Sequence, residues 1–103
     1  MSEELKSPPT LDELRAHRDE IIALADRYGA YNIRVFGSVA RGDATPDSDV
    51  DLLVSFREHT SLYEMSGLLQ DLKELIGRDV SLVSEGGLRE RFRKRIQDDI
   101  TTL

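Results

Sequence analysis

Apolar positions recur at helical spacing in three stretches of the chain. They predict amphipathic helices over about residues 10–28, 61–76 and 88–100. Thr10 with Glu13, and Ser61 with Glu64, fit capping boxes, in which each side chain of the pair accepts a hydrogen bond from the backbone of the other residue. These two pairs therefore predict where the first two helices begin.

Three shorter stretches have the composition or alternation that is typical of strands, over residues 32–36, 49–56 and 79–83. In the second stretch, Val50, Leu52 and Val54 share one face. Asp49 and Asp51 share the other face, because side chains alternate in direction along a strand. The resulting order, αβ(turn)βαβα, predicts an α/β (α+β) fold, a short mixed sheet of about three strands with helices packed on it.

The length of 103 residues fits one domain, which we place at residues 10–103 after a flexible leader of residues 1–9. Because the chain has no cysteine, disulfides, thiolate metal sites and cysteine nucleophiles are excluded. Its apolar runs are far shorter than the ~20 residues that cross a bilayer, and residues 1–9 do not resemble a secretory signal. We therefore expect a cytoplasmic protein that has no membrane contact.

The charge of the chain is negative overall but uneven. Fourteen basic and twenty acidic residues give a net charge of −6, which argues against binding nucleic acid through its phosphates. Residues 89–95 hold five cations and one anion, a local charge of +4 that leaves −10 on the rest of the chain. Such a run is typical of a solvated helix face, and it also fits contact with an acidic partner.

The segment over residues 36–42, FGSVARG, follows a predicted strand directly and is expected to begin a short helix. Glycine lets a backbone approach a ligand closely, and free amides at the start of a helix attract an anion such as phosphate. Gly37 and Gly42 have the spacing of a Walker loop, but Asp43 and Ala44 stand where that loop requires Lys and Ser or Thr. The segment is therefore a candidate phosphate site outside that motif.

Asp49 and Asp51 are the second candidate feature, because a separation of two residues places both carboxylates on the same face of a strand. Without a cation, two such groups stay well solvated, or one of them takes up a proton at a raised pKa. With Mg²⁺, which accepts carboxylate oxygens together with waters and substrate phosphates, their repulsion becomes a binding site. Phosphoryl and nucleotidyl transfer use this arrangement.

Gly37-Ser38, ten intervening residues and then Asp49-x-Asp51 resemble the G-S-x(10)-D-x-D signature of the DNA polymerase β-like nucleotidyltransferase superfamily. In their wider context these residues resemble the minimal nucleotidyltransferases, over most of the chain from about Asp19 to the final helix. The resemblance implies that Gly37 and Ser38 hold the phosphates of ATP. It also implies that Asp49 and Asp51 are the catalytic residues and the ligands of Mg²⁺.

The same resemblance makes Arg41 a candidate phosphate contact, whereas the local sequence equally favours an ion pair of Arg41 with Asp43 or Asp47. For the whole protein it implies transfer of AMP to a protein hydroxyl and a role as the antitoxin of a pair with a helical HEPN-domain toxin. Small size also fits a homo- or hetero-oligomer, by analogy with the family. Nucleic acid is not an expected partner.

One position departs from the family pattern. The family usually has a third carboxylate on the strand that follows the central helix, and that position is Ser81 here. Because serine does not replace a carboxylate, we expect lower turnover, a weaker metal site or no catalysis. Asp79 is the nearest substitute, but it lies about 7 Å further along the strand, which is too far in the expected register. An alternative function is therefore a degenerate module that neutralises a partner by stoichiometric binding.

Overall fold

The computed structural model describes residues 7–103, so the first six residues of the expected leader lie outside it. Its elements, in chain order, are α1 (Leu11–Ala16), α2 (Arg18–Arg27), β1 (Ala30–Phe36), α3 (Gly37–Arg41), β2 (Val50–Phe56), α4 (Leu62–Ile76), β3 (Val80–Ser84), the 3₁₀ helix η1 (Glu85–Gly87), α5 (Glu90–Ile96) and β4 (Thr101–Thr102). Within the described range no helix is long and apolar enough to span a membrane.

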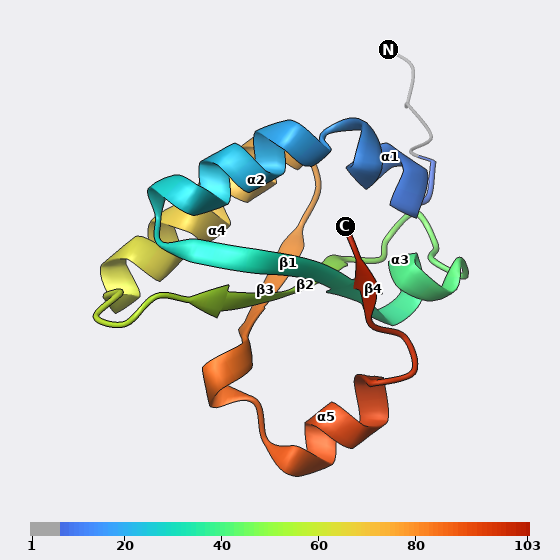
Figure 1. The fold of residues 1–103 in the computed structure, drawn as a ribbon. Helices are drawn as coiled ribbons and strands as arrows, with labels where there is room; N and C mark the ends of the chain where they lie inside the picture. The colour runs from blue at the N-terminus through green and yellow to red at the C-terminus, as the bar shows by residue number, and fades with distance from the viewer. Residues whose placement is uncertain (1–6) are drawn as a thin grey trace.

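The strands form one mixed sheet in the order β3-β2-β1-β4 (Figure 1). The central strands β1 and β2 are antiparallel, β2 and β3 are parallel, and β4 pairs antiparallel with β1. The expected mixed sheet is confirmed, but it has a fourth strand. Thr101 and Thr102 form it by pairing with Val35 and Arg34 of β1.

The expected final helix was too long. Its helical part is α5, which ends at Ile96, and the chain then turns so that Ile100 packs beside Ile96 from outside the helix. Apolar residues recur at every fourth position through this region, so the spacing alone predicts a continuous helix and does not indicate the turn. What ends the helix is the pairing of the last residues with β1, a contact distant in sequence.

The first expected helix is also divided, because the backbone at His17 leaves the helical region between α1 and α2. Thr10 caps α1 as predicted by accepting a hydrogen bond from the Glu13 amide. The other predicted hydrogen bond of that capping box, from the Thr10 amide to the Glu13 carboxylate, is wrong. The Glu13 carboxylate pairs with Arg78 at 2.8 Å instead. The second capping box, Ser61 with Glu64, is complete.

Two groups of apolar side chains lie on opposite faces of the sheet. Helices α2 and α4 cover one face (Figure 1), and the main core lies between them and the sheet. Its fully buried side chains include Ile21, Leu52, Val54, Leu68 and Leu72. Helix α5 covers part of the opposite face through a small cluster. We call Phe36, Leu53 and Ile96, with the partly buried Val83, Leu88, Phe92 and Ile100, the small cluster.

Candidate nucleotide and metal site

Gly37 and Asp51 lie against each other at the end of β1. Phe36, the last residue of β1, pairs with Asp51 in the β1–β2 ladder, and the chain then bends at Gly37 against the Asp51 side chain. A Cβ added to Gly37 would collide with the Asp51 carboxylate, and Gly37 has φ +75°, in the region that favours glycine. The candidate phosphate turn and the candidate metal ligand, separated in sequence, therefore meet in the fold.

The negative charges of Asp49 and Asp51 act on each other. Asp51 is half-buried whereas Asp49 is exposed at the start of β2. Burial raises the pKa of Asp51, the negative charge of Asp49 raises it further, and the positive charge of Arg41 opposes both effects. Ionisation of Asp51 is therefore costly in the folded chain, and a cation placed near both carboxylates would relieve that cost.

Helix α3 is a single turn that positions Ser38 and Arg41 around this point. Gly42, in the left-handed conformation, ends the helix, and the amides of Gly42 and Asp43 both donate to the Ser38 carbonyl. The Arg41 guanidinium pairs with Asp43 at 3.2 Å and with Asp99 at 2.9 Å. The ion pair with Asp43 was one of the two expected roles of Arg41, and the partner Asp99 was not expected.

The position of the missing third acid is now defined. In the parallel β2–β3 ladder Ser81 pairs with Asp51, so their side chains lie next to each other on the same face. Asp79 precedes β3 and lies two residues before Ser81, the position that pairs with Asp51. Among residues 7–103, no group of three or more histidine, cysteine, aspartate or glutamate side chains is arranged to hold a metal ion. Asp79 therefore does not complete a three-acid site.

The donor set fits one Mg²⁺ ion that is shared with a substrate. Mg²⁺ is commonly held by one or two carboxylates and completes its shell with waters and substrate phosphates. Asp49 and Asp51 supply those two carboxylates, and the repulsion between their like charges favours a cation placed near both. A dedicated site for a second ion is not supported, because Ser81 offers only a hydroxyl.

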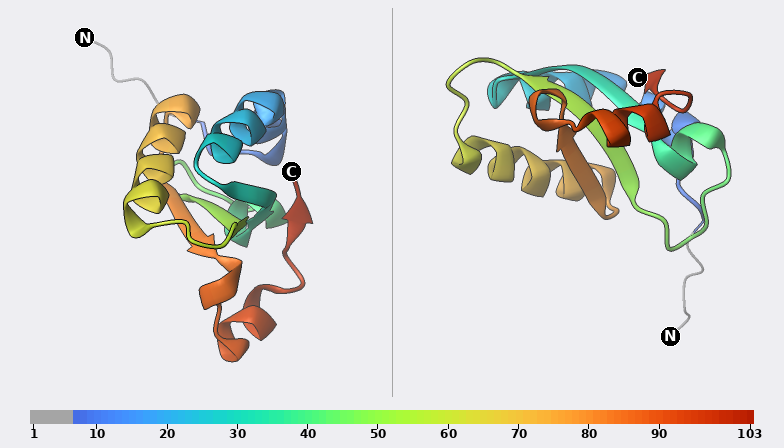
Figure 2. Two further views of the ribbon diagram at one scale, coloured as in Figure 1. Left: turned by 60° about the vertical axis from the view of Figure 1, so that its left-hand side comes forward. Right: turned by 90° about the horizontal axis from the view of Figure 1, so that it is seen from below.

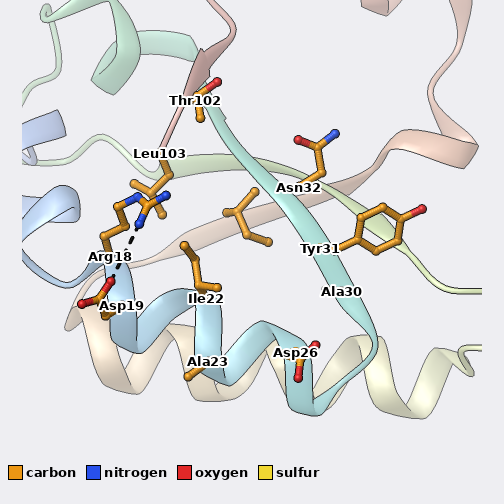
Figure 3. Close-up of a pocket in the computed structure, with 11 residues that line it drawn as sticks. Arg18, Asp19, Ile22, Ala23, Asp26, Ala30, Tyr31, Asn32, Thr102 and Leu103 are labelled. Carbon is orange, nitrogen blue, oxygen red and sulfur yellow. Dashed lines mark ion pairs between the residues drawn. The ribbon is translucent and has the colours of Figure 1, made fainter.

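A separate groove of about 560 Å³ lies between α2, the first half of β1 and β4 (Figure 3). Ile22 and Tyr31 face it, and an ion pair of Arg18 with Asp19 lies at one end. None of the five predicted site residues lines this groove. The acid pair and the turn instead lie on the face of the sheet that α5 covers.

Sequence reasoning missed two features of the site. The first is Asp99, which follows the basic run and gave no local signal that it would reach Arg41. The second is the contact of α5 with the strand that carries the turn, since Phe92 stacks edge-on against Phe36 with ring centres 5.9 Å apart. The contact of Asp99 follows the end of α5 at Ile96, which the helical pattern concealed.

Known proteins resemble this chain over nearly its whole length. A family model described as "Nucleotidyltransferase domain" matches residues 17–102. The protein adenylyltransferase MntA of Thermococcus cleftensis is 40% identical over 95 residues, which are 88% of this chain and 93% of that relative. A solved structure assigned to the minimal nucleotidyltransferases is 45% identical with a TM-score of 0.80, and the match covers 91% of this chain and 96% of that one.

The fold also occurs in a toxin–antitoxin complex. A chain from the structure of a tri-AMPylated Shewanella oneidensis HEPN toxin with its MNT antitoxin has a TM-score of 0.65 to this chain. The match covers 85% of this chain and 69% of that chain. At 19% identity this likeness establishes the shared fold alone.

Proposed function

The chain belongs to the family of nucleotidyltransferase domains, and we propose that it is a protein adenylyltransferase, which transfers AMP from ATP to a hydroxyl group of a partner protein with Mg²⁺ as its metal. The observation that carries the proposal is the contact between the Gly37 backbone and the Asp51 carboxylate, with Asp49 beside them. The relatives named protein adenylyltransferases support the class of acceptor.

Each proposed role follows from what the residues offer. The backbone at Gly37 and Ser38, where no Cβ intervenes at Gly37, approaches the phosphates of ATP. Asp49 and Asp51 would hold Mg²⁺, and the ion would supply positive charge that neutralises the triphosphate. The acceptor oxygen forms a bond to the α-phosphorus, the bond to the α–β bridging oxygen breaks, and pyrophosphate leaves. Ser81, which pairs with Asp51, offers no carboxylate that could accept the proton of the acceptor hydroxyl, so we propose that this proton leaves to solvent.

We propose a helical HEPN-type protein as the partner, with this chain as the antitoxin of the pair. The complex that contains the tri-AMPylated toxin supports this proposal, because a chain of the same fold stands there beside an AMP-modified protein. ATP, the proposed substrate, is available in the cytoplasm, where we place the activity. We propose that Arg41 contacts the phosphates of ATP and that its ion pair with Asp43 is then broken.

The test uses ATP labelled at the α-phosphate, Mg²⁺ and a HEPN-type partner. We expect label on the partner, and no label when the γ-phosphate carries it, because AMP and not phosphate is transferred. Asp49→Asn combined with Asp51→Asn should lower the rate at least about 1,000-fold, since Mg²⁺ loses both ligands.

Asp19→Asn combined with Asp26→Asn is the matched control for this test. It removes the same two charges from exposed positions on α2 and should leave the rate unchanged. Transfer that survives the loss of Asp49 and Asp51, or that the control abolishes equally, would contradict the assigned site. Mg²⁺-dependent ATP binding without any label transfer would contradict the enzymatic function.

A second candidate function is stoichiometric neutralisation of the partner by a chain that has lost catalysis, and the pairing of Ser81 with Asp51 favours it. Ser81→Asp restores a carboxylate beside Asp51 and should raise the rate of label transfer about 10-fold or more if the missing acid limits turnover. Ser81→Asn, of similar size but without charge, is the control. A native rate of zero with intact 1:1 binding of the partner would establish the second function.

A further inference from the structure

Helix α5 presents an exposed cationic surface. Arg89, at its N-cap, and Arg91, Lys94 and Arg95 are exposed, whereas Arg93 turns inward to pair with Glu85. None of the four exposed cations forms an ion pair within the part of the chain that the structure describes. We call these four side chains the α5 surface.

Several arginines elsewhere in the described part of the chain pair with carboxylates. Arg34, Arg57 and Arg78 each pair with a carboxylate, as Arg41 does. Outside the α5 surface, the described cations without a carboxylate partner are Arg15, Arg27 and Lys73, one on each of three helices, whereas four such cations lie together on the α5 surface. Their concentration on one short helix gives the molecule an electropositive side, opposed by the negative charge of the rest.

The α5 surface is fixed beside the candidate site. Phe92 stacks on Phe36, the residue before Gly37, and Ile96 packs with Leu53, which follows Asp51 by two residues on the same face. After the helix, Asp99 pairs with Arg41 of α3. The view from below in Figure 2 shows α5 crossing the strands with its C-terminal end next to α3.

From this placement we propose that the α5 surface binds an acidic segment of the acceptor protein, next to the hydroxyl that receives AMP; this rests on the proposed function. An acceptor must approach the sheet face that carries Asp49 and Asp51, and these carboxylates repel an acidic chain. The exposed cations attract such a chain and hold it at the border of the site. The charge of −10 outside residues 89–95 favours a protein segment over the long phosphate backbone of a nucleic acid.

The test measures binding and transfer separately, with a random glutamate–tyrosine copolymer as the acidic probe and a lysine–tyrosine copolymer as its counterpart. In fluorescence anisotropy without ATP, the native chain should bind the acidic copolymer in a salt-sensitive manner and should not bind the basic one. Arg91→Glu with Lys94→Glu should weaken this binding at least about 10-fold. Arg91→Gln with Lys94→Gln should weaken it by a smaller factor while preserving helix propensity.

The matched control is Arg18→Glu with Arg27→Glu, which changes the charge equally at exposed positions on α2 and should alter the affinity less than about 2-fold. In transfer assays the α5 variants should raise KM for the acidic copolymer and leave kcat unchanged, since neither residue belongs to the proposed nucleotide and metal site. Equal weakening by the control, or tighter binding of a single-stranded RNA of matched charge, would overturn the proposal.

Failure of this inference is distinguishable from failure of the proposed function. If the native chain transfers AMP but its binding of the acidic copolymer does not depend on the α5 surface, the proposal for that surface alone is overturned. Binding that depends on α5, combined with no AMP transfer to the HEPN-type partner, would support the surface and contradict the transferase.

Discussion

The two faces of the sheet carry apolar clusters that differ in what else they hold. On the face under α2 and α4, the main core is made of apolar side chains, and the buried residues of β2 on that side are Val50, Leu52 and Val54. On the opposite face, the same strand presents Asp51 and then Leu53, so a site residue and a core residue are neighbours. The side chains on one face therefore stabilise the fold, whereas those on the other face both stabilise the fold and position the candidate site.

This difference shows how a small domain accommodates a charged site. The carboxylates of Asp49, just before β2, and Asp51 destabilise this region locally, and the cost is tolerated because Val50, Leu52 and Val54 on the opposite face of β2 are fully buried. The small cluster then positions the turn, since Phe36 precedes Gly37 and packs with Leu53. Substitutions on the two faces should consequently separate effects on stability from effects on nucleotide binding.

The largest effect is expected from Leu72→Ala in the main core. Leu72 is fully buried, so its truncation should lower the free energy of unfolding by about 3 kcal/mol, a large part of the total for a domain of this size. Because Leu72 lies on the face opposite the site, Mg²⁺-dependent ATP binding by the folded chain should stay within about 2-fold. Urea unfolding and calorimetric titration at low temperature measure the two quantities.

The matched variant is Leu53→Ala, which removes the same atoms from the small cluster. We expect a similar or smaller loss of stability, of about 2–3 kcal/mol, together with ATP binding weakened about 5-fold or more, because Leu53 supports Phe36 and the turn. If Leu72→Ala weakened ATP binding as much as Leu53→Ala, the division of roles between the two faces would be wrong.

The parts of the fold that the sequence predicted are those fixed by local chemistry. Ser61 begins α4 and Gly77 ends it, because a capping side chain and a left-handed glycine act within one turn of chain. The break at His17 gave no local signal, and the strand at Thr101 was missed because a tertiary contact, its pairing with β1, decides it. The shift from helix to strand near the C-terminus depends on the free edge of β1, which no local pattern reports.

The same distinction applies to the candidate site. The resemblance of the two motifs to the family signature implied that the turn at Gly37 and the acid pair form one site, and in the structure they meet at the end of the antiparallel β1–β2 ladder. Their roles in binding ATP and Mg²⁺ stay predictions. The pairing of Arg41 with Asp99 could not be anticipated, since it joins residues 58 positions apart through the misassigned C-terminal region.

The smallest effect, and the one with the opposite sign, is expected from Asp51→Asn. The folded state raises the pKa of Asp51 above its ordinary value of 3.8, so the folded chain binds the proton more tightly than the unfolded chain does. Stability is therefore lost as pH rises from that value through the folded pKa, and the deficit stays constant above it.

Removing the charge should thus stabilise the protein at pH 7 by about 1 kcal/mol or less, and the gain should disappear below about pH 4. Thermal unfolding of the native chain and the variant across this pH range measures it, with Asp19→Asn, an exposed acid on α2, as the control that should change little. Added Mg²⁺ with ATP should reduce the difference in stability between the variant and the native chain, because the two ligands together should stabilise the native chain alone. A variant that is less stable at pH 7 would instead make Asp51 a structural residue, and the contrast between the two faces would fail at its central position.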